Sequence, residues 1–296
     1  MPIKRLKQKK YFPILVLVFL AMIWGSSFIL IKKGLLAYSP IQVGTLRIIF
    51  ACLVLLPIAL KNIKGNLKPH WKKFLALGLI SNLIPAILFA TAETELSSSL
   101  AGMLNALTPV CTIVVGVTFF KSKINRPVAL GLLIGLTGSI IISFVGGSGE
   151  LGTFNIYALM VIFATLLYGI SGNMIKDYVN TFDPVVLISL TTLTIGPISL
   201  AVLLTTDFVS QTVTHPDAWI SLLCLFILGS IGTALALAVF NKLIKSTSAV
   251  FASSATYLIP IVAVGWGLID GEVLFPLHFA GMGFIILGVI IINKYK

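Results

Sequence analysis

The chain has 296 residues, of which 58% are hydrophobic and only 10% are charged. A soluble globular domain has about a quarter of its residues charged, so this composition excludes an ordinary soluble protein and indicates one that crosses a membrane many times. The formal net charge of +12 does not indicate nucleic-acid binding, because the basic residues lie in short segments between apolar runs and leave no solvated basic face.

Ten apolar stretches are each long enough to cross the hydrocarbon layer, which takes about 20 helical residues. They lie near residues 13–31, 41–60, 73–92, 97–120, 127–145, 155–176, 185–205, 218–241, 247–269 and 276–293. The first run follows a basic N-terminus as in a signal peptide, but it is too long and lacks a small-residue cleavage site, so we expect it to be retained. The chain is therefore predicted to be an all-α integral membrane protein.

Charge decides the orientation of these spans. If both termini are cytoplasmic, that side receives every basic residue except Lys32, Lys33 and Arg47, and the other side receives every acid except Asp177 and Asp183. This asymmetry obeys the positive-inside rule, so we predict ten helices with both termini in the cytoplasm. Lys32 and Lys33 break the rule; we interpret them as side chains that reach the outer interface near the carbonyl end of the first helix.

The two halves of the chain resemble each other. Pairs separated by 144 positions are Trp24/Tyr168, Gly25/Gly169, Ser27/Ser171, Lys32/Lys176 and Pro40/Pro184, and later pairs separated by 150 or 151 are Ala101/Ala252, Pro109/Pro260, Gly116/Gly267, Gly131/Gly281 and Gly138/Gly288. We predict two five-helix repeats, 1–147 and 148–296. Because five is odd, the second repeat enters the membrane from the opposite side, and such inverted repeats are typical of transporters that work by alternating access.

The first and sixth helices carry equivalent polar faces at mid-depth. Trp24 and Ser27 share one face, Tyr168 and Ser171 share the other, and Asn173 is adjacent. Trp24 is too deep for an interfacial aromatic belt. It either lines a cavity or packs inside the bundle with its indole N–H on a neighbouring carbonyl. Symmetry places Trp24 and Tyr168 opposite each other, so we predict these five residues as candidate substrate contacts.

The fourth and ninth helices each combine polar residues with a proline. Asn105 precedes Pro109, and Thr256 and Tyr257 precede Pro260. Each proline removes a backbone donor and frees a carbonyl about one turn earlier. We predict the polar residues as substrate contacts and the prolines as hinges; the alternative is a simple kink.

Two charged residues and one amide complete the candidates. Asn82 is deep in the third helix and must be satisfied inside the bundle, so we add it to the substrate contacts. Glu93 lies on the same stripe at the outer surface and is expected to be solvated, with a coupling role as the alternative. Arg47, inside the second span, either reaches the interface, pairs with an acid or binds a substrate carboxylate.

The segments "IWGSSFILIKKG", "SPIQVGTLRIIFACLVLLPIAL", "SSSLAGMLNALTPVCTIVVGVTFF" and "TSAVFASSATYLIPIVAVGWGLIDGE", in this order and with the internal repeat, resemble the EamA family of the drug/metabolite transporter superfamily. The resemblance implies ten helices, two inverted repeats, a central cavity, and export or exchange of small metabolites such as amino acids. An acid common in the family is present as Glu272 but is replaced by Lys121 in the first half. Because the two places face opposite sides, we interpret this exchange as topological.

We therefore predict a multi-pass transporter of the plasma membrane, in a bacterium the inner membrane, that moves small polar metabolites as a monomer or homodimer among membrane lipids. The alternative is a lipid flippase or a transport subunit of the same fold. An enzyme is not expected, because no buried Asp, Glu or His forms a catalytic set. No cofactor, metal or nucleic-acid partner is expected: the three cysteines lie in apolar runs, the histidines are scattered, and no Walker A motif occurs.

Overall fold

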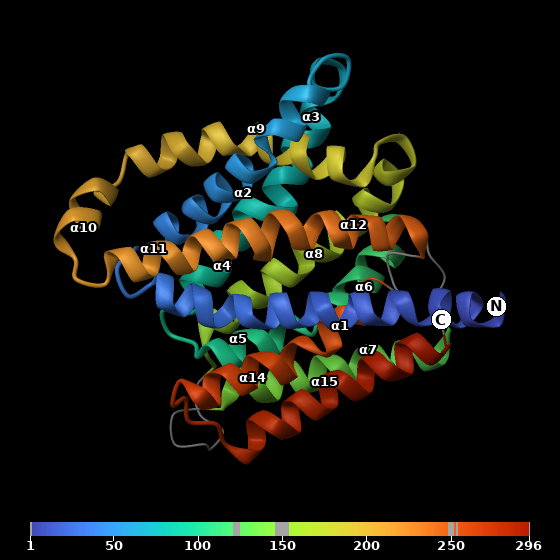
Figure 1. Ribbon diagram of the computed structural model, residues 1–296. Helices are drawn as coiled ribbons and strands as arrows, with labels where there is room; N and C mark the ends of the chain where they lie inside the picture. The colour runs from blue at the N-terminus through green and yellow to red at the C-terminus, as the bar shows by residue number, and fades with distance from the viewer. Residues whose placement is uncertain (1, 121–124, 146–153, 248–251, 253, 296) are drawn as a thin grey trace.

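Helices make up nearly all of the computed structural model, which describes residues 2–120, 125–145, 154–247, 252 and 254–295 (Figure 1). The first half contains α1 (Pro2–Gly34), α2 (Pro40–Asn62), α3 (Leu67–Gly78), η1 (Leu79–Leu83), α4 (Ile84–Ala92), α5 (Ser98–Asn105), α6 (Thr108–Phe120) and α7 (Arg126–Phe144). The second half contains α8 (Ile156–Thr181), α9 (Pro184–Leu204), α10 (Phe208–Thr214), α11 (Ala218–Ile227), η2 (Leu228–Leu235), α12 (Ala236–Ser246), η3 (Ser254–Tyr257), α14 (Ile259–Ile269) and α15 (Pro276–Tyr295). The predicted repeat boundary at 147/148 and Lys121 lie outside the described residues.

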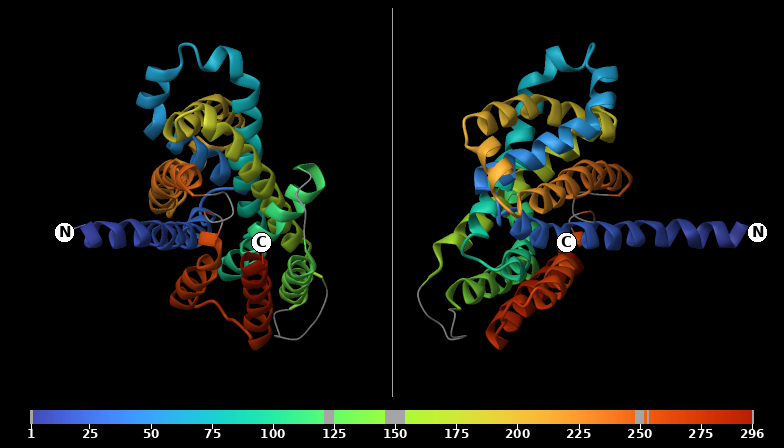
Figure 2. Two further views of the ribbon diagram at one scale, coloured as in Figure 1. Left: turned by 90° about the vertical axis from the view of Figure 1, so that its right-hand side faces the viewer. Right: turned by 60° about the vertical axis from the view of Figure 1, so that its left-hand side comes forward.

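Eight helical segments of the described chain are long and apolar enough to cross a membrane. They coincide with the first eight predicted spans. The ninth and tenth predictions correspond to shorter apolar helices, Ala255–Ile269 and Pro276–Ile291, of 10 to 17 residues. The all-helical membrane fold is therefore confirmed, whereas ten crossings and cytoplasmic termini stay predictions. Both chain ends lie at the right of Figure 1, and Figure 2 shows the N-terminal part of α1 projecting beyond the other helices.

The second helix of each half begins with proline. Ser39 precedes Pro40 of α2: its hydroxyl accepts a hydrogen bond from the Gln42 N–H, and the Gln42 side chain accepts one from the Ser39 N–H. Asp183 precedes Pro184 of α9, and its carboxylate accepts from the two N–H groups that follow the proline. Proline suits the first helical position because its fixed φ is already helical and no donor is lost. These caps fix where the two helices start.

Helices of one half pack against their counterparts in the other half, α7 on α15 and α2 on α9, and α5 of the fourth span packs on α14 of the ninth. Between α7 and α15 the glycines meet reciprocally. A Cβ on Gly288 would lie 2.5 Å from the Gly131 carbonyl oxygen, and one on Gly138 would collide with the Gly281 carbonyl oxygen. Because these four glycines form two sequence pairs, the contact is symmetric, and the small residues let the two helices pack closely.

Two π-helical turns occur at matched places, η1 in the third span and η2 in the eighth. The spacing of apolar residues gives no sign of these turns. π-helical turns are rare, but those that occur often lie at functional sites, where the widened turn shifts backbone carbonyls out of the regular hydrogen-bond ladder.

The fourth and ninth predicted helices are interrupted rather than merely kinked. α5 ends at Asn105, and α6 starts at Thr108 with Pro109 in its first turn. In the same way, η3 ends at Tyr257 and α14 starts at Ile259, immediately before Pro260. The two interruptions place irregular backbone at corresponding depths of the two halves.

Candidate substrate cavity between the two halves

A cavity of about 120 Å³ lies between the halves. Its described lining consists of Trp24, Ser27, Phe28, Ile31, Arg47, Ser81, Asn82, Phe89, Asn105, Thr108, Thr112, Tyr168, Ser171, Gly172, Ile175, Leu237, Phe240, Thr256 and Ile259. Cavities of roughly 150 Å³ hold a ligand the size of benzene, so this one suits a small molecule rather than a large drug.

The first helix of each half lines the cavity with matched residues. Each of four pairs separated by 144 positions contributes both members to the lining: Trp24/Tyr168, Ser27/Ser171, Phe28/Gly172 and Ile31/Ile175. They follow one face of α1 and one face of α8, as the spacing of three and four residues requires. The cavity therefore lies on the pseudo-symmetry axis that relates the two halves.

Trp24 both packs and lines the cavity, so the two alternatives considered from sequence do not exclude each other. Its indole N–H donates to the carbonyl oxygen of Gly232 in η2 at 3.1 Å, and its ring meets Phe240 edge-on, with the centroids 5.1 Å apart. Tyr168 stacks on Phe89 at a centroid distance of 5.9 Å. Two aromatic pairs thus form part of the cavity wall.

The hydroxyls of the first and sixth helices bond within their own helices. Ser27 Oγ donates to the Ile23 carbonyl oxygen at 3.1 Å, and Ser171 Oγ donates to that of Tyr168 at 3.0 Å. This leaves the lone pairs of both oxygens to accept from a ligand.

The π-helical turn η1 contributes Ser81 and Asn82 to the lining. The Asn82 amide donates to Ser81 Oγ at 2.7 Å, which satisfies part of this buried group inside the bundle, as expected. Its carbonyl oxygen remains available to accept a hydrogen bond.

The interrupted helices contribute Asn105 and Thr256, which are separated by 151 positions and both line the cavity. Pro109 cannot donate to the Asn105 carbonyl oxygen, and Thr108 Oγ1 donates to it instead at 2.8 Å. The proline therefore brings a side-chain hydrogen bond into the cavity wall.

Asn173 and Tyr257 are not among the described residues that line the cavity, and their role as direct substrate contacts stays a prediction. The Asn173 amide donates to the carbonyl oxygens of Thr112 at 3.1 Å and Gly169 at 2.9 Å, and thereby joins α8 to α6. Tyr257 packs against the apolar core. Adjacency along the helix did not reveal the contact of Asn173 with Thr112.

Arg47 is the one permanently charged residue among the described lining residues. Its Nε donates to Thr233 Oγ1 at 2.7 Å, and it forms no ion pair with any acid in the described part of the chain. The guanidinium faces the cavity without an ion pair to a described acid, and its role stays a prediction.

Glu93 is buried, which overturns the expectation of a solvated acid. It follows α4, its exposed fraction is 7%, and neither carboxylate oxygen has a hydrogen-bond partner among the described residues. Burial and the charge of Glu272 raise the pKa of Glu93 well above its usual value, although Lys32 and Arg47 oppose this. The sequence places Glu93 at a helix end but carries no signal that it is buried.

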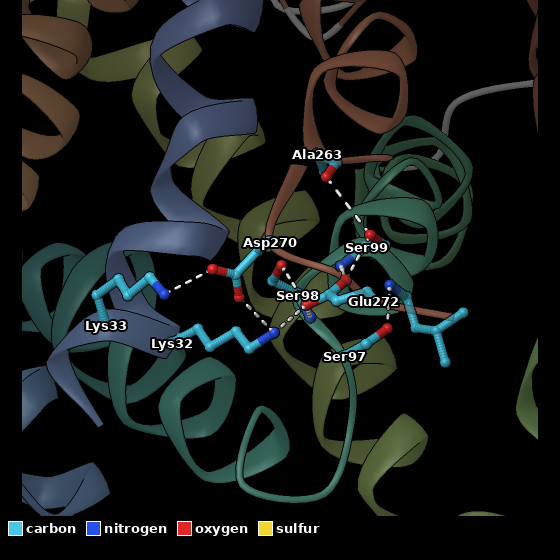
Figure 3. Close-up of polar contacts among 9 residues, drawn as sticks. Lys32, Lys33, Ser97, Ser98, Ser99, Ala263, Asp270 and Glu272 are labelled. Carbon is cyan, nitrogen blue, oxygen red and sulfur yellow. Dashed lines mark hydrogen bonds and ion pairs between the residues drawn. The ribbon is translucent and has the colours of Figure 1, made fainter. Parts of the chain in front are cut away.

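Lys32 and Lys33 form ion pairs with the segment after α14, which their interpretation as outer anchors did not include (Figure 3). Lys32 Nζ lies 2.8 Å from Asp270 Oδ2 and 2.8 Å from Glu272 Oε1, and Lys33 Nζ lies 2.6 Å from Asp270 Oδ1. These lysines with Asp270, Glu272, Ser98 and Ser99 make up what we call the Lys32 cluster. It joins the end of α1 and the start of α5, in the first half, to the segment after α14 in the second half.

Glu272 is the centre of the Lys32 cluster, and its side chain is only 4% exposed. Its carboxylate accepts from the backbone N–H groups of Ser98 and Ser99 at 2.9 and 3.0 Å, and from both hydroxyls at 2.8 and 2.6 Å (Figure 3). Burial alone would raise the pKa of Glu272, but the hydrogen bonds from Lys32 and the serines lower it to about 2. The interpretation of Glu272 as purely topological is therefore incomplete, because it also caps α5.

Gly267 makes room for this carboxylate. A Cβ at Gly267 would collide with both Ser99 Oγ and Glu272 Oε2. The internal repeat pairs Gly267 with Gly116, but the sequence does not indicate that Gly267 lies against the Glu272 carboxylate.

Comparison with known proteins agrees with this architecture. The model of the EamA-like transporter family matches residues 11–144 and again 155–294. An uncharacterized transporter of Archaeoglobus fulgidus is 28% identical over 96% of this chain and 87% of its own length. The uncharacterized inner membrane transporter YedA of Escherichia coli K12 is 23% identical over 94% and 89%. YvbV of Bacillus subtilis, also an uncharacterized transporter, is 27% identical over 84% and 81%.

One solved crystal structure is similar with a TM-score of 0.63 over 94% of this chain and 95% of that chain, at 14% identity, which shows a shared fold. Since the family model covers nearly the whole chain, the resemblance inferred from the motifs is confirmed: the chain belongs to the EamA-like transporter family and is a multi-pass membrane transporter.

Proposed function

We propose that this protein is a secondary transporter that moves small polar metabolites, amino acids or related compounds, across the plasma membrane by alternating access, in export or exchange. The observation that carries the proposal is the cavity lined by equivalent residues of both halves. Substrate sites of inverted-repeat transporters lie at this interface. The relative YedA is named an inner membrane transporter, which supports the same membrane for this chain.

The chemistry of the cavity supports a small polar substrate. Hydroxyl and amide groups alternate with aromatic rings around a volume of about 120 Å³. Binding sites for small molecules combine apolar walls with a few polar groups that fix orientation. We propose Trp24, Tyr168 and Asn105 as the main substrate contacts, because each lines the cavity.

The interruptions at Pro109 and Pro260 support movement of the two halves against each other. A helix whose ladder is broken bends there at little cost, because the hydrogen bonds that resist bending are already absent. Both breaks adjoin cavity-lining residues, so a rotation about them would reshape the cavity.

The Lys32 cluster supports a closure at the predicted outer end. It joins α1 and α5 of the first half to the segment after α14 of the second, and Ile31, one residue before Lys32, lines the cavity. Opening on this side would have to separate Lys32 and the α5 serines from Glu272. Ion pairs between domains are reversible contacts of this kind.

Glu93 is our candidate for proton coupling. Burial without hydrogen bonds favours the neutral form of a carboxylate, and the approach of a positive group favours its ionised form. Lys32 and Arg47 are the cations that act on it, and Glu272 is the acid that opposes its ionisation. Movement of the Lys32 cluster would change this balance.

Counterflow in proteoliposomes tests the proposal. Vesicles are loaded with a panel of unlabelled amino acids, organic acids and amines, and uptake of the labelled compound is followed. We expect saturable exchange of one class that falls at least about tenfold in Trp24→Ala and Tyr168→Ala, the loss that corresponds to about 1.4 kcal/mol of binding. Trp219→Ala is the matched control, because Trp219 is 72% exposed on α11. Absence of flux for every soluble metabolite, together with lipid scrambling, would overturn the proposal.

A further inference from the structure

Arg47 stands alone as a charge in the cavity wall. The other described lining residues are neutral, and the lining includes no described acid. A guanidinium cannot lose its proton to escape the cost of burial, so it must be compensated by an anion or by hydrogen bonds. A cation without an ion pair among the described residues, facing a mostly apolar cavity, therefore points to an anionic group of the ligand.

The guanidinium is oriented by a single protein contact. Nε donates to Thr233 Oγ1 at 2.7 Å, and this hydroxyl donates in turn to the Leu228 carbonyl oxygen at 3.2 Å within η2. The Thr233 hydroxyl therefore accepts from Arg47 in a fixed direction. The four N–H donors on the two terminal nitrogens of Arg47 have no acceptor among the described residues.

The backbone of Arg47 is fixed as well. A Cβ on Gly229 would lie 2.7 Å from the Arg47 carbonyl oxygen and 2.6 Å from Phe50 Cβ. This glycine lets η2 approach α2 to backbone contact. With its backbone held by that contact and its Nε held by Thr233, Arg47 presents its terminal nitrogens in a preset orientation.

Two parallel N–H donors fit the two oxygens of a carboxylate. We propose that Arg47 binds the carboxylate of the transported molecule through its terminal nitrogens, so that a carboxylate is the recognised group and an amino group is not required. The inference rests on the proposed function and names its substrate class, small carboxylates. The aromatic walls formed by Phe89 and Tyr168 and by Trp24 and Phe240 would receive the apolar remainder of such a molecule.

The second half of the inference follows from the missing acid. An α-ammonium group would find no carboxylate partner among the described lining residues, only carbonyl and hydroxyl oxygens and ring faces. A carboxylate without an amino group should therefore bind about as well as the matching amino acid, and an amine without a carboxylate should not bind.

The test uses three compounds of one carbon skeleton: leucine, 4-methylpentanoate and 3-methylbutylamine. Each competes at pH 7.5 against counterflow of the best carboxylate of the panel, with the full-length protein in liposomes. We expect leucine and 4-methylpentanoate to compete within a few fold of each other and the amine not to compete. Competition by the amine as strong as that by the acid would overturn the inference and leave the proposed function standing.

Variants of Arg47 give the second arm. A charge-assisted hydrogen-bonded contact is worth about 1.5–3 kcal/mol, so Arg47→Gln should raise the carboxylate concentration needed for half-saturation about 10- to 100-fold. Arg47→Lys keeps the charge but not the two parallel N–H donors, so it should raise this concentration by less. Thr233→Val removes only the orienting hydroxyl, so its half-saturating carboxylate concentration should lie between those of the wild type and Arg47→Gln. Unchanged half-saturation in Arg47→Gln would overturn the inference.

A binding measurement separates the two proposals if no flux occurs. Purified protein in detergent is heated with 4-methylpentanoate or with the amine. Stabilisation by the carboxylate that disappears in Arg47→Gln would support the inference although transport had failed; stabilisation by neither compound, or equally by both, would overturn it. Apparent Tm without ligand shows whether each variant is folded.

Discussion

Lys32 Nζ and Glu272 Oε1 lie 2.8 Å apart although 240 positions separate them and they belong to different halves of the chain. The same carboxylate accepts four hydrogen bonds from Ser98 and Ser99 at the start of α5. One side chain therefore ties the end of α1 and the start of α5 to the segment that follows α14.

Glu272 makes stability sensitive to acid. Its pKa is about 2 in the folded protein against 4.5 unperturbed, so its contribution is fully present above about pH 5 and is lost as the pH falls toward 2. The difference corresponds to about 3 kcal/mol. We expect Glu272→Gln to lower the apparent Tm in detergent at pH 7 and to flatten its decline between pH 6 and pH 3. Equal slopes for the two proteins would contradict the assignment.

Gly267→Ala tests the fit around the same carboxylate. The added methyl would collide with Ser99 Oγ and Glu272 Oε2, and such overpacking costs about 1–3 kcal/mol. Gly265, in the same helix, has no atom within 4 Å of a built Cβ, so Gly265→Ala should be neutral or stabilising by up to about 1 kcal/mol. Thermal unfolding of both variants checks the prediction; equal effects would show that Gly267 does not seat the carboxylate.

Glu93→Gln tests the coupling role. The folded pKa of Glu93 is raised, so the neutral form contributes stability at low pH that is lost as the pH rises through the folded pKa. Glutamine imitates the neutral form. We expect Glu93→Gln to fold with unchanged or higher apparent Tm at pH 8, to keep exchange of substrate, and to lose the pH dependence of net uptake.

Glu95→Gln is the control for that experiment, because Glu95 is an exposed acid two residues further along. A wild-type pH profile in Glu93→Gln, or the same change of profile in Glu95→Gln, would exclude Glu93 as the coupling group.

Much of the cavity could be predicted from the repeat. Once Trp24 aligned with Tyr168 and Ser27 with Ser171, helical periodicity placed all four on faces that meet across a pseudo-symmetry axis, and the structure places them around one cavity. The predicted roles of these residues in substrate binding stay predictions.

What sequence reasoning missed depends on contacts between distant segments. Nothing near Lys32 identifies Glu272 as its partner, and nothing near Glu93 shows that it is buried. The π-helical turns η1 and η2 depend on a shift of the hydrogen-bond ladder that leaves no pattern in the apolar residues. Arg47 was visible as a lone charge in a span, but its hydrogen bond to Thr233 joins residues 186 positions apart and could not be predicted.

The central claim is that the substrate occupies the cavity between the halves, and Gly172→Cys tests it most directly. Gly172 lines the cavity, and a Cβ there would have no atom within 4 Å, so the thiol should be accommodated without disturbing the fold. Gly283→Cys on α15 is the matched control, because Gly283 has the same free space and lies outside the cavity lining.

Both substitutions are made with Cys52, Cys111 and Cys224 replaced by serine or alanine, and the proteins are treated with a small thiol-reactive methanethiosulfonate in liposomes. We predict that modification of Gly172→Cys abolishes counterflow and that the transported substrate slows the modification, with no such protection at Gly283→Cys. Full counterflow after complete modification of Gly172→Cys would contradict the account.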